Sequence, residues 1–85
     1  MLKLITYDLN KPHKDYPKLF DGIKSYGNWA HALESVWLVK SNSTAGQIRD
    51  HLKQFVDEND QIKVVTVSDW ATFNISSEIT NWMKN

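Results

Sequence analysis

The sequence predicts an α+β domain: a four-stranded antiparallel sheet with two helices on one face. Strand and helix patterns follow one another in the order strand, helix, strand, strand, helix, strand. The connections between them are short, and 85 residues leave no room for a second core. About 41% of the residues are apolar and 24% are charged, which is an ordinary globular composition.

The first strand is expected over residues 2–8. Apolar residues occur at both its odd and its even positions, so both faces of the strand should be at least partly covered. The strand ends in Asp8, whose carboxylate this pattern places at the tip. A polar loop containing Pro12 follows.

The first helix is expected over about residues 16–26. Asp15 or Tyr16 would cap it, Pro17 suits its first turn, and Gly27 is a good terminator. Its apolar stripe consists of Leu19, Phe20, Ile23 and Tyr26.

Residues 29–40 contain two strand patterns. Residues 29–33 alternate weakly, and residues 36–39 form a continuous apolar run of β-favouring residues. Glu34 and Ser35 lie between them, either as a tight connection or as a bulge in one longer strand.

A second helix is expected over about residues 45–56, because Thr44 and Gln47 fit a capping box. Its apolar stripe consists of Ile48, Leu52, Phe55 and Val56. An acidic turn over residues 57–60 leads to the last clear strand, residues 61–68. An aromatic loop over residues 69–74 then precedes a short helix, which Ser76 or Ser77 would cap and which carries Ile79, Trp82 and Met83.

This order of elements is the split βαβ, or ferredoxin-like, arrangement. Right-handed crossovers place both helices on one face of the sheet, which leaves the other face without cover of its own. Residues 36–38 are all apolar, so at least one of them must point toward the open face, whichever way the strand alternates. An exposed apolar face is usually an interaction site, and we therefore expect a homodimer. The C-terminal aromatic segment should be part of the cover.

Charge and cysteine content exclude several classes of protein. Ten basic and ten acidic residues balance, which argues against non-specific coating of nucleic acid but allows a local basic patch. Without cysteine there is no disulfide, thiolate nucleophile or Cys-ligated metal. No apolar run is long enough to span a membrane, and the N-terminus lacks a signal-peptide pattern, so we expect no membrane association and a cytoplasmic location.

Asp8 is the first candidate for chemistry. A carboxylate at a strand tip is a suitable ligand for Mg²⁺ or Mn²⁺, which prefer oxygen ligands. In a twofold dimer, Asp8 from each copy could hold one ion between them. The alternative is that Asp8 only terminates the strand and binds loop amides.

Basic and histidine residues offer weaker signals. Lys11, Lys14, Lys18 and Lys24 lie on or near the first helix and could bind phosphate, with Tyr7 or Trp29 as a stacking partner. They could equally form the wet face of an amphipathic helix. The three histidines, His13, His31 and His51, match no metal-binding spacing.

The motifs Tyr7-Asp8, a lysine-bearing helix ending at Gly27, and Leu33-Glu34-Ser35-Val36-Trp37 resemble a known family. It is the small dimeric ferredoxin-like family that contains CRISPR-associated protein two and the virulence-associated protein D ribonucleases. The resemblance spans about residues 1–67. It implies a metal-dependent endonuclease in which Asp8 is catalytic and binds Mg²⁺ or Mn²⁺ with its twin in the dimer.

The resemblance also places Ser35 near the twofold axis. Together with Lys11, Lys14 and Lys18, which lie on or near the first helix, Ser35 is a candidate for binding nucleic acid. The chain departs from the family in two respects: sparse lysines replace an arginine-rich first helix, and an aromatic segment replaces the C-terminal strand. The alternative function is a non-catalytic dimeric interaction module that binds a partner protein through Trp70, Phe73 and Trp82.

Overall fold

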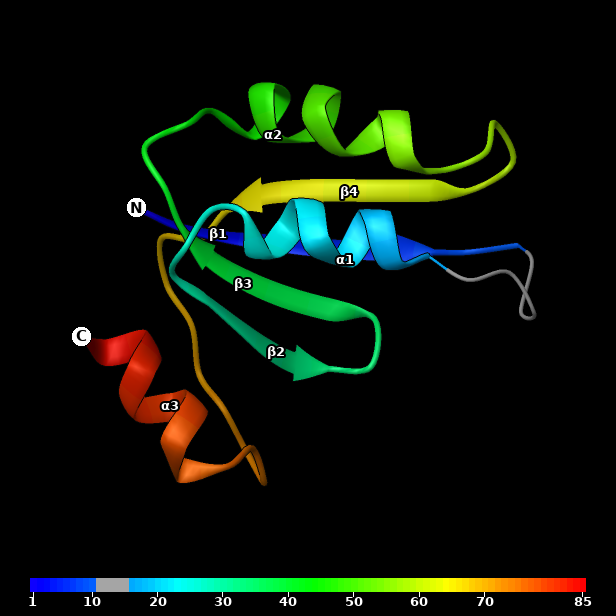
Figure 1. Cartoon of the computed structure of the whole chain (residues 1–85). Coiled ribbons are helices and arrows are strands. Elements are labelled where there is room, and N and C mark those ends of the chain that lie inside the picture. Colours follow the sequence, from blue (N-terminus) through cyan, green and yellow to red (C-terminus); the bar gives the residue numbers. More distant parts are fainter. Residues whose placement is uncertain (11–15) are drawn as a thin grey trace.

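A computed structural model of the chain describes residues 1–10 and 16–85 (Figure 1). The elements are β1 (Leu2–Asp8), α1 (Pro17–Lys24), β2 (Trp29–Leu33), β3 (Val36–Lys40), α2 (Ala45–Leu52), a 3₁₀ turn (Lys53–Phe55), β4 (Gln61–Thr66) and α3 (Ser77–Lys84). The order of strands and helices expected from the sequence is confirmed.

The four strands form one sheet in the order β2-β3-β1-β4, and every neighbouring pair is antiparallel. The register places Ile5 of β1 between Trp37 of β3 and Val64 of β4. Because β1 is central and β4 runs against it, the end of β1 and the start of β4 meet at one end of the sheet. The α+β class with a four-stranded antiparallel sheet is therefore as predicted.

Helices α1 and α2 cover one face of the sheet, and the core lies between these helices and the sheet (Figure 1). Alternation along each strand selects the residues that face the helices. The fully buried side chains of this layer come from β1, β3 and both helices: Ile5, Leu19, Ile23, Val39, Ile48 and Leu52. The helical stripes seen in the sequence are thus the core faces of α1 and α2.

Two helix ends differ from the sequence-based prediction. The second helix ends at Leu52 and continues as a 3₁₀ turn, although its apolar stripe extends to Val56. An apolar stripe does not distinguish an α-helix from a 3₁₀ turn, because both place residues three or four positions apart on the same side. The first helix ends at Lys24, and its cap, Tyr16, makes no side-chain capping hydrogen bond.

The structure also defines the β2–β3 turn, the end of β4 and the start of α2. Glu34 and Ser35 form a tight turn between β2 and β3, with an irregular register between His31 and Leu33. The last strand ends at Thr66, two residues earlier than expected. The capping box of Thr44 and Gln47 is confirmed, since each side chain accepts from the other residue's backbone N–H.

The chain after β4 crosses the face of the sheet opposite α1 and α2 and ends in α3 beside β2 (Figure 1). Ser76 caps α3 by accepting from the backbone N–H of Ile79. The Trp82 indole donates to Asn28 Oδ1 at 2.9 Å, and Lys40 Nζ donates to the Trp82 carbonyl at 2.6 Å. The predicted tail helix is therefore present and tied to the sheet. Within the described ranges, no helix has the length and hydrophobicity needed to cross a membrane.

Candidate functional site

Asp8 lies at the C-terminal tip of β1 with its side chain exposed, paired across the sheet with Gln61 of β4. By alternation it shares a sheet face with Leu4 and Thr6, the face opposite α1 and α2. A shallow hollow of about 360 Å³ surrounds it, lined by Thr6, Tyr7, Asp8, Gln61, Ile62 and Lys63. The predicted position at a strand tip is confirmed.

Within the described residues, the Asp8 carboxylate takes no part in holding the fold together. It forms no hydrogen bond or ion pair with any residue in the described part of the chain. The following loop is bound instead by Asp60, whose Oδ1 accepts the backbone N–H of Asn10 at 2.8 Å. The structural role considered for Asp8 therefore belongs to Asp60, within residues 1–10 and 16–85.

Asp60 anchors three segments at this end of the domain. Besides Asn10, it accepts from the backbone N–H of Asp57 at 2.8 Å and from the Tyr16 hydroxyl at 3.2 Å. The bond from the Asn10 backbone contributes most to lowering the pKa of Asp60 below its usual value. The loop after β1, the start of α1 and the turn before β4 are thus joined on one carboxylate.

Ser35 lies beside the end of β1, because the Tyr7 backbone N–H donates to the Ser35 carbonyl at 3.3 Å. The turn is held by a second contact from the same residue: the Tyr7 hydroxyl donates to the Glu34 carbonyl at 3.2 Å. That hydroxyl also accepts from Trp37 Nε1 at 3.0 Å. The fold therefore brings Asp8 and Ser35 to the same end of the sheet, and Tyr7 fixes the turn that carries Ser35.

Of the three lysines predicted to bind nucleic acid, only Lys18 lies within the described residues. Lys18 is exposed in the first turn of α1, which begins at the same end of the domain as the tip of β1. Lys11 and Lys14 lie outside the described residues. Lys63 was missed by sequence reasoning, although it lines the hollow around Asp8. The antiparallel register of β1 and β4 would have indicated it, since Lys63 pairs with Thr6 on the face that carries Asp8.

The donor set for a metal is incomplete within one chain. Among the described residues, no group of three or more histidine, aspartate or glutamate side chains could hold a metal ion. Mg²⁺ needs only one or two carboxylates when water and phosphate oxygens supply the other ligands. The exposed Asp8 carboxylate, which has no partner among the described residues, therefore fits half of such a site, and a second copy of Asp8 would complete it.

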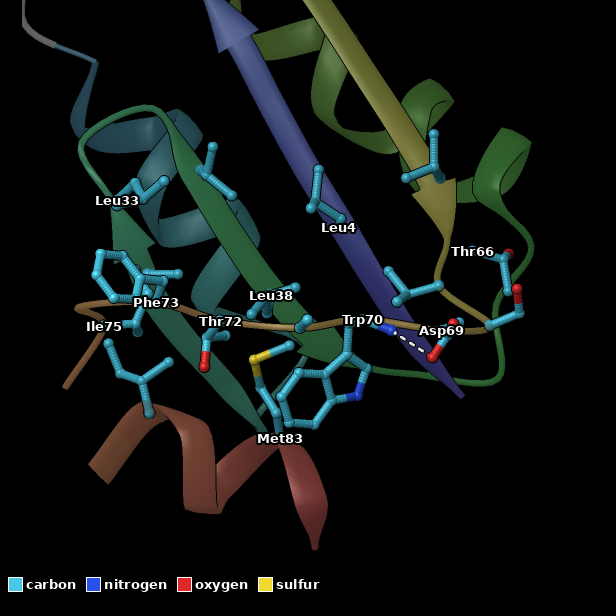
Figure 2. A pocket seen from close by; sticks show the side chains of 17 residues that line it. Leu4, Leu33, Leu38, Thr66, Asp69, Trp70, Thr72, Phe73, Ile75 and Met83 are labelled. Carbon is cyan, nitrogen blue, oxygen red and sulfur yellow. Dashed lines mark hydrogen bonds between the residues drawn. The ribbon is translucent and has the colours of Figure 1, made fainter. Parts of the chain in front are cut away.

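The sheet face that carries Asp8 also has a large apolar groove. Its volume is about 490 Å³, and it lies between the strands and the chain that follows β4 (Figure 2). Leu33, Val65 and Phe73 line it although 55%, 39% and 86% of their respective surfaces are exposed. The open face expected from the sequence is therefore only partly covered by the C-terminal segment.

The three aromatic residues considered for partner binding have different surroundings. Trp70 is half-buried and faces the groove from the segment after β4, close to Met83 of α3 (Figure 2). Trp82 contacts Asn28 and has the Lys40 ammonium 4.5 Å from its ring centroid. Phe73 is the most exposed of them. The Trp82 side chain therefore already has contacts within the chain, whereas most of the Phe73 side chain is exposed and can contact a partner protein.

His51 has a hydrogen-bonding partner within the fold. Its Nδ1 lies 2.9 Å from the Tyr26 hydroxyl, and its ring contacts Phe55 edge-on. Burial raises the pKa of Tyr26, so the phenol is neutral and can donate to the imidazole. His51 thus joins α1 to α2, and His13 lies outside the described residues.

No protein-family model matches the sequence. The family resemblance therefore rests on the short motifs around Asp8 and Ser35, which the fold brings to one end of the sheet.

Proposed function

We propose that this chain is a ferredoxin-like, metal-dependent endonuclease-like protein that acts on RNA or DNA as a cytoplasmic homodimer. The strand order β2-β3-β1-β4 and the placement of α1 and α2 on one face support the ferredoxin-like assignment. The observation that carries the function is the exposed Asp8 carboxylate, which ends a central strand and bonds no other described residue.

A homodimer would supply the missing half of the metal site. The apolar groove and Asp8 lie on the same face of the sheet, so two copies packed through this face would turn both carboxylates toward the interface. A twofold interface is self-complementary, and the exposed Leu33, Val65 and Phe73 provide apolar area for it. The two Asp8 carboxylates would then hold one Mg²⁺ or Mn²⁺ ion.

Each component of the site has a distinct task. The bound ion would supply charge neutralisation at a phosphodiester and a more acidic water. Asp8 would position the ion, and Lys18 and Lys63 would attract the phosphate backbone. The Ser35 hydroxyl, on the turn fixed by Tyr7, is a hydrogen-bond donor for a phosphate oxygen.

The nuclease test compares purified wild-type protein with Asp8→Asn on labelled RNA and DNA, with Mg²⁺, with Mn²⁺ and with chelator. We expect cleavage only with metal and only by the wild-type protein. Asp21→Asn is the matched control, because Asp21 is also exposed and its side chain lies on α1. Cleavage by Asp8→Asn at the wild-type rate, or no cleavage by wild-type protein with either metal, would exclude this function.

The second candidate is a non-catalytic dimeric module that binds a partner protein, with Trp70, Phe73 and Trp82 as its contacts. The exposure of Phe73 beside the apolar groove favours it. This function requires neither metal nor Asp8, and it predicts that Phe73→Ala weakens partner binding without changing the melting temperature. Because Trp82 already contacts Asn28, Trp82→Ala should instead lower the melting temperature.

A further inference from the structure

A stack of aromatic rings runs from the core to the surface at β2. Trp37 is 3% exposed and lies at its centre, with the Phe20 centroid 5.8 Å away and nearly parallel. The His31 ring stacks on Trp37 with centroids 3.9 Å apart and an interplanar angle of 9°. His31 is itself exposed, so the imidazole is the last ring of the stack before solvent.

The His31 ring is held in one orientation. Its Nε2 lies 3.0 Å from the Glu34 carbonyl oxygen, which can only accept, so Nε2 carries the proton and donates. With one ring face against Trp37, the opposite face can receive another flat ring. The cost of ordering this side chain is therefore already met in the folded protein.

Trp29 extends this surface along the same strand. It lies two residues before His31, about 7 Å away on the same face of β2. Its ring is tilted by 51° against Trp37, and 38% of its surface is exposed. Lys24, at the end of α1, places its ammonium 5.2 Å from the Trp29 centroid and 6.0 Å from that of Trp37. Two exposed rings thus lie next to the Lys24 ammonium.

From this arrangement we infer that Trp29, His31 and Lys24 form a stacking platform for single-stranded nucleic acid. Unpaired bases stack on aromatic faces without regard to sequence, and a nearby cation attracts the backbone phosphates. A duplex does not offer its base faces, so it fits this surface less well. The inference rests on the proposed action on nucleic acid, but its test requires neither metal nor cleavage.

The platform is separate from the Asp8 site. It lies on the helix-facing side of the edge strand β2, whereas Asp8 lies on the opposite face at the tip of the central strand β1. The chain has no net charge, and the described residues place one cation close to the platform, so stacking should supply most of the affinity. We therefore expect binding that tolerates salt better than binding by a basic surface does.

The test measures binding of fluorescently labelled single-stranded RNA, single-stranded DNA and duplex, all in chelator. We expect both single strands to bind more tightly than the duplex and to quench tryptophan fluorescence. Trp29→Ala and His31→Ala should each weaken binding about tenfold. Trp29→Phe should retain most of the affinity because a phenyl ring still stacks. Lys24→Gln should lower the salt slope of log Kobs by about 0.7.

Two controls separate this inference from the proposed nuclease. Lys84→Gln removes an exposed lysine from α3 and should leave the affinity unchanged. Glu58→Gln changes an exposed residue of the turn before β4 and should also leave the affinity unchanged. Because binding is measured in chelator, it is read independently of metal-dependent cleavage. Melting curves confirm that each variant is folded, and His31→Ala, which changes an exposed residue, serves if Trp29→Ala is unstable.

The outcomes distinguish the two proposals. Failure to bind single strands, equal binding of duplex, or full affinity in Trp29→Ala and His31→Ala would overturn the platform. Displacement of the oligonucleotide by an acidic peptide at lower concentration than by competing single strand would assign the surface to protein and also overturn it. Normal binding without metal-dependent cleavage would overturn the nuclease alone.

Discussion

The Asp60 carboxylate accepts the backbone N–H of Asn10 at 2.8 Å, so the turn before β4 holds the loop after β1. Asp8, two residues before Asn10, forms no such bond within the described residues. One carboxylate at this end of the domain therefore maintains the fold, and the other is available for a ligand. This division of roles makes the two residues experimentally separable.

Asp60→Asn should destabilise the protein at neutral pH, and Asp8→Asn should not. An amide still offers one acceptor oxygen, but it cannot accept as strongly as the carboxylate from Asn10, Asp57 and Tyr16. Thermal melts at pH 7 check this, with Asp21→Asn as an exposed control. A melting temperature that falls equally in Asp8→Asn would contradict the assignment of roles.

The contribution of the Asp60 carboxylate to stability should depend on pH. Its folded-state pKa is lowered, chiefly by the Asn10 amide, so it lies below the unfolded value of about 3.9. The stability that the carboxylate contributes is therefore complete above that value and is lost as pH falls through the folded-state pKa. The difference in melting temperature between wild type and Asp60→Asn should shrink on acidification below about pH 4. If the difference in melting temperature instead grew on acidification, the predicted direction of the pH dependence would be wrong.

Gly22→Ala and Gly46→Ala should have opposite effects on stability. A Cβ on Gly22 would lie 2.8 Å from Phe55 Cε2 and 3.2 Å from Leu52 Cδ2, where α1 approaches α2. We expect overpacking to exceed the gain in helix propensity and to cost about 1 kcal/mol net. At Gly46 the nearest side-chain atoms are 3.9 Å from the position of an added Cβ, so alanine there should stabilise α2 by up to about 1 kcal/mol. Denaturant titrations of both variants check the two signs.

Tyr7→Phe should loosen the turn that carries Ser35. The change removes the donor to the Glu34 carbonyl and leaves the buried Trp37 Nε1 without its present acceptor. We expect a loss of about 1 kcal/mol in the free energy of unfolding. Amide hydrogen exchange at Glu34 and Ser35 should accelerate more than in α2. Unchanged exchange in the turn would show that Tyr7 does not fix it.

Val65→Asp should weaken the proposed homodimer. Val65 is 39% exposed and lines the apolar groove on the face that carries Asp8, so a charge there would have to be buried on association. Sedimentation at several concentrations should show dissociation of the variant at concentrations where the wild type is dimeric. Gln54→Asp, on the exposed 3₁₀ turn, is the control. An unchanged association constant in Val65→Asp would place the interface elsewhere.

The elements themselves were accessible from the sequence because local signals agreed with the fold. The strand pattern of residues 2–8, Pro17, and the capping box at Thr44 each indicated an element that the structure contains. The end of the second helix was missed because Phe55 and Val56 continue the apolar stripe through a 3₁₀ turn. A stripe reports which side is buried and does not report the hydrogen-bonding pattern.

The candidate site was accessible only in part. Asp8 was visible because a strand pattern ends at it, and the order of elements brings Ser35 to the same end. The role of Asp60 depends on a hydrogen bond to Asn10 across 50 positions, so it appeared in the sequence only as one member of an acidic turn. The stacking of His31 on Trp37 likewise follows from the β2–β3 register, which composition and periodicity do not specify.

The central claim is that Asp8 is half of a metal site completed by a second copy of the chain. The most direct measurement counts Mn²⁺ ions bound per chain by electron paramagnetic resonance, alongside the oligomeric state by sedimentation. We predict one ion for every two chains, and we expect Asp8→Asn to lose this ion while remaining a dimer. Binding of one ion per monomer, or undiminished binding by dimeric Asp8→Asn, would contradict it.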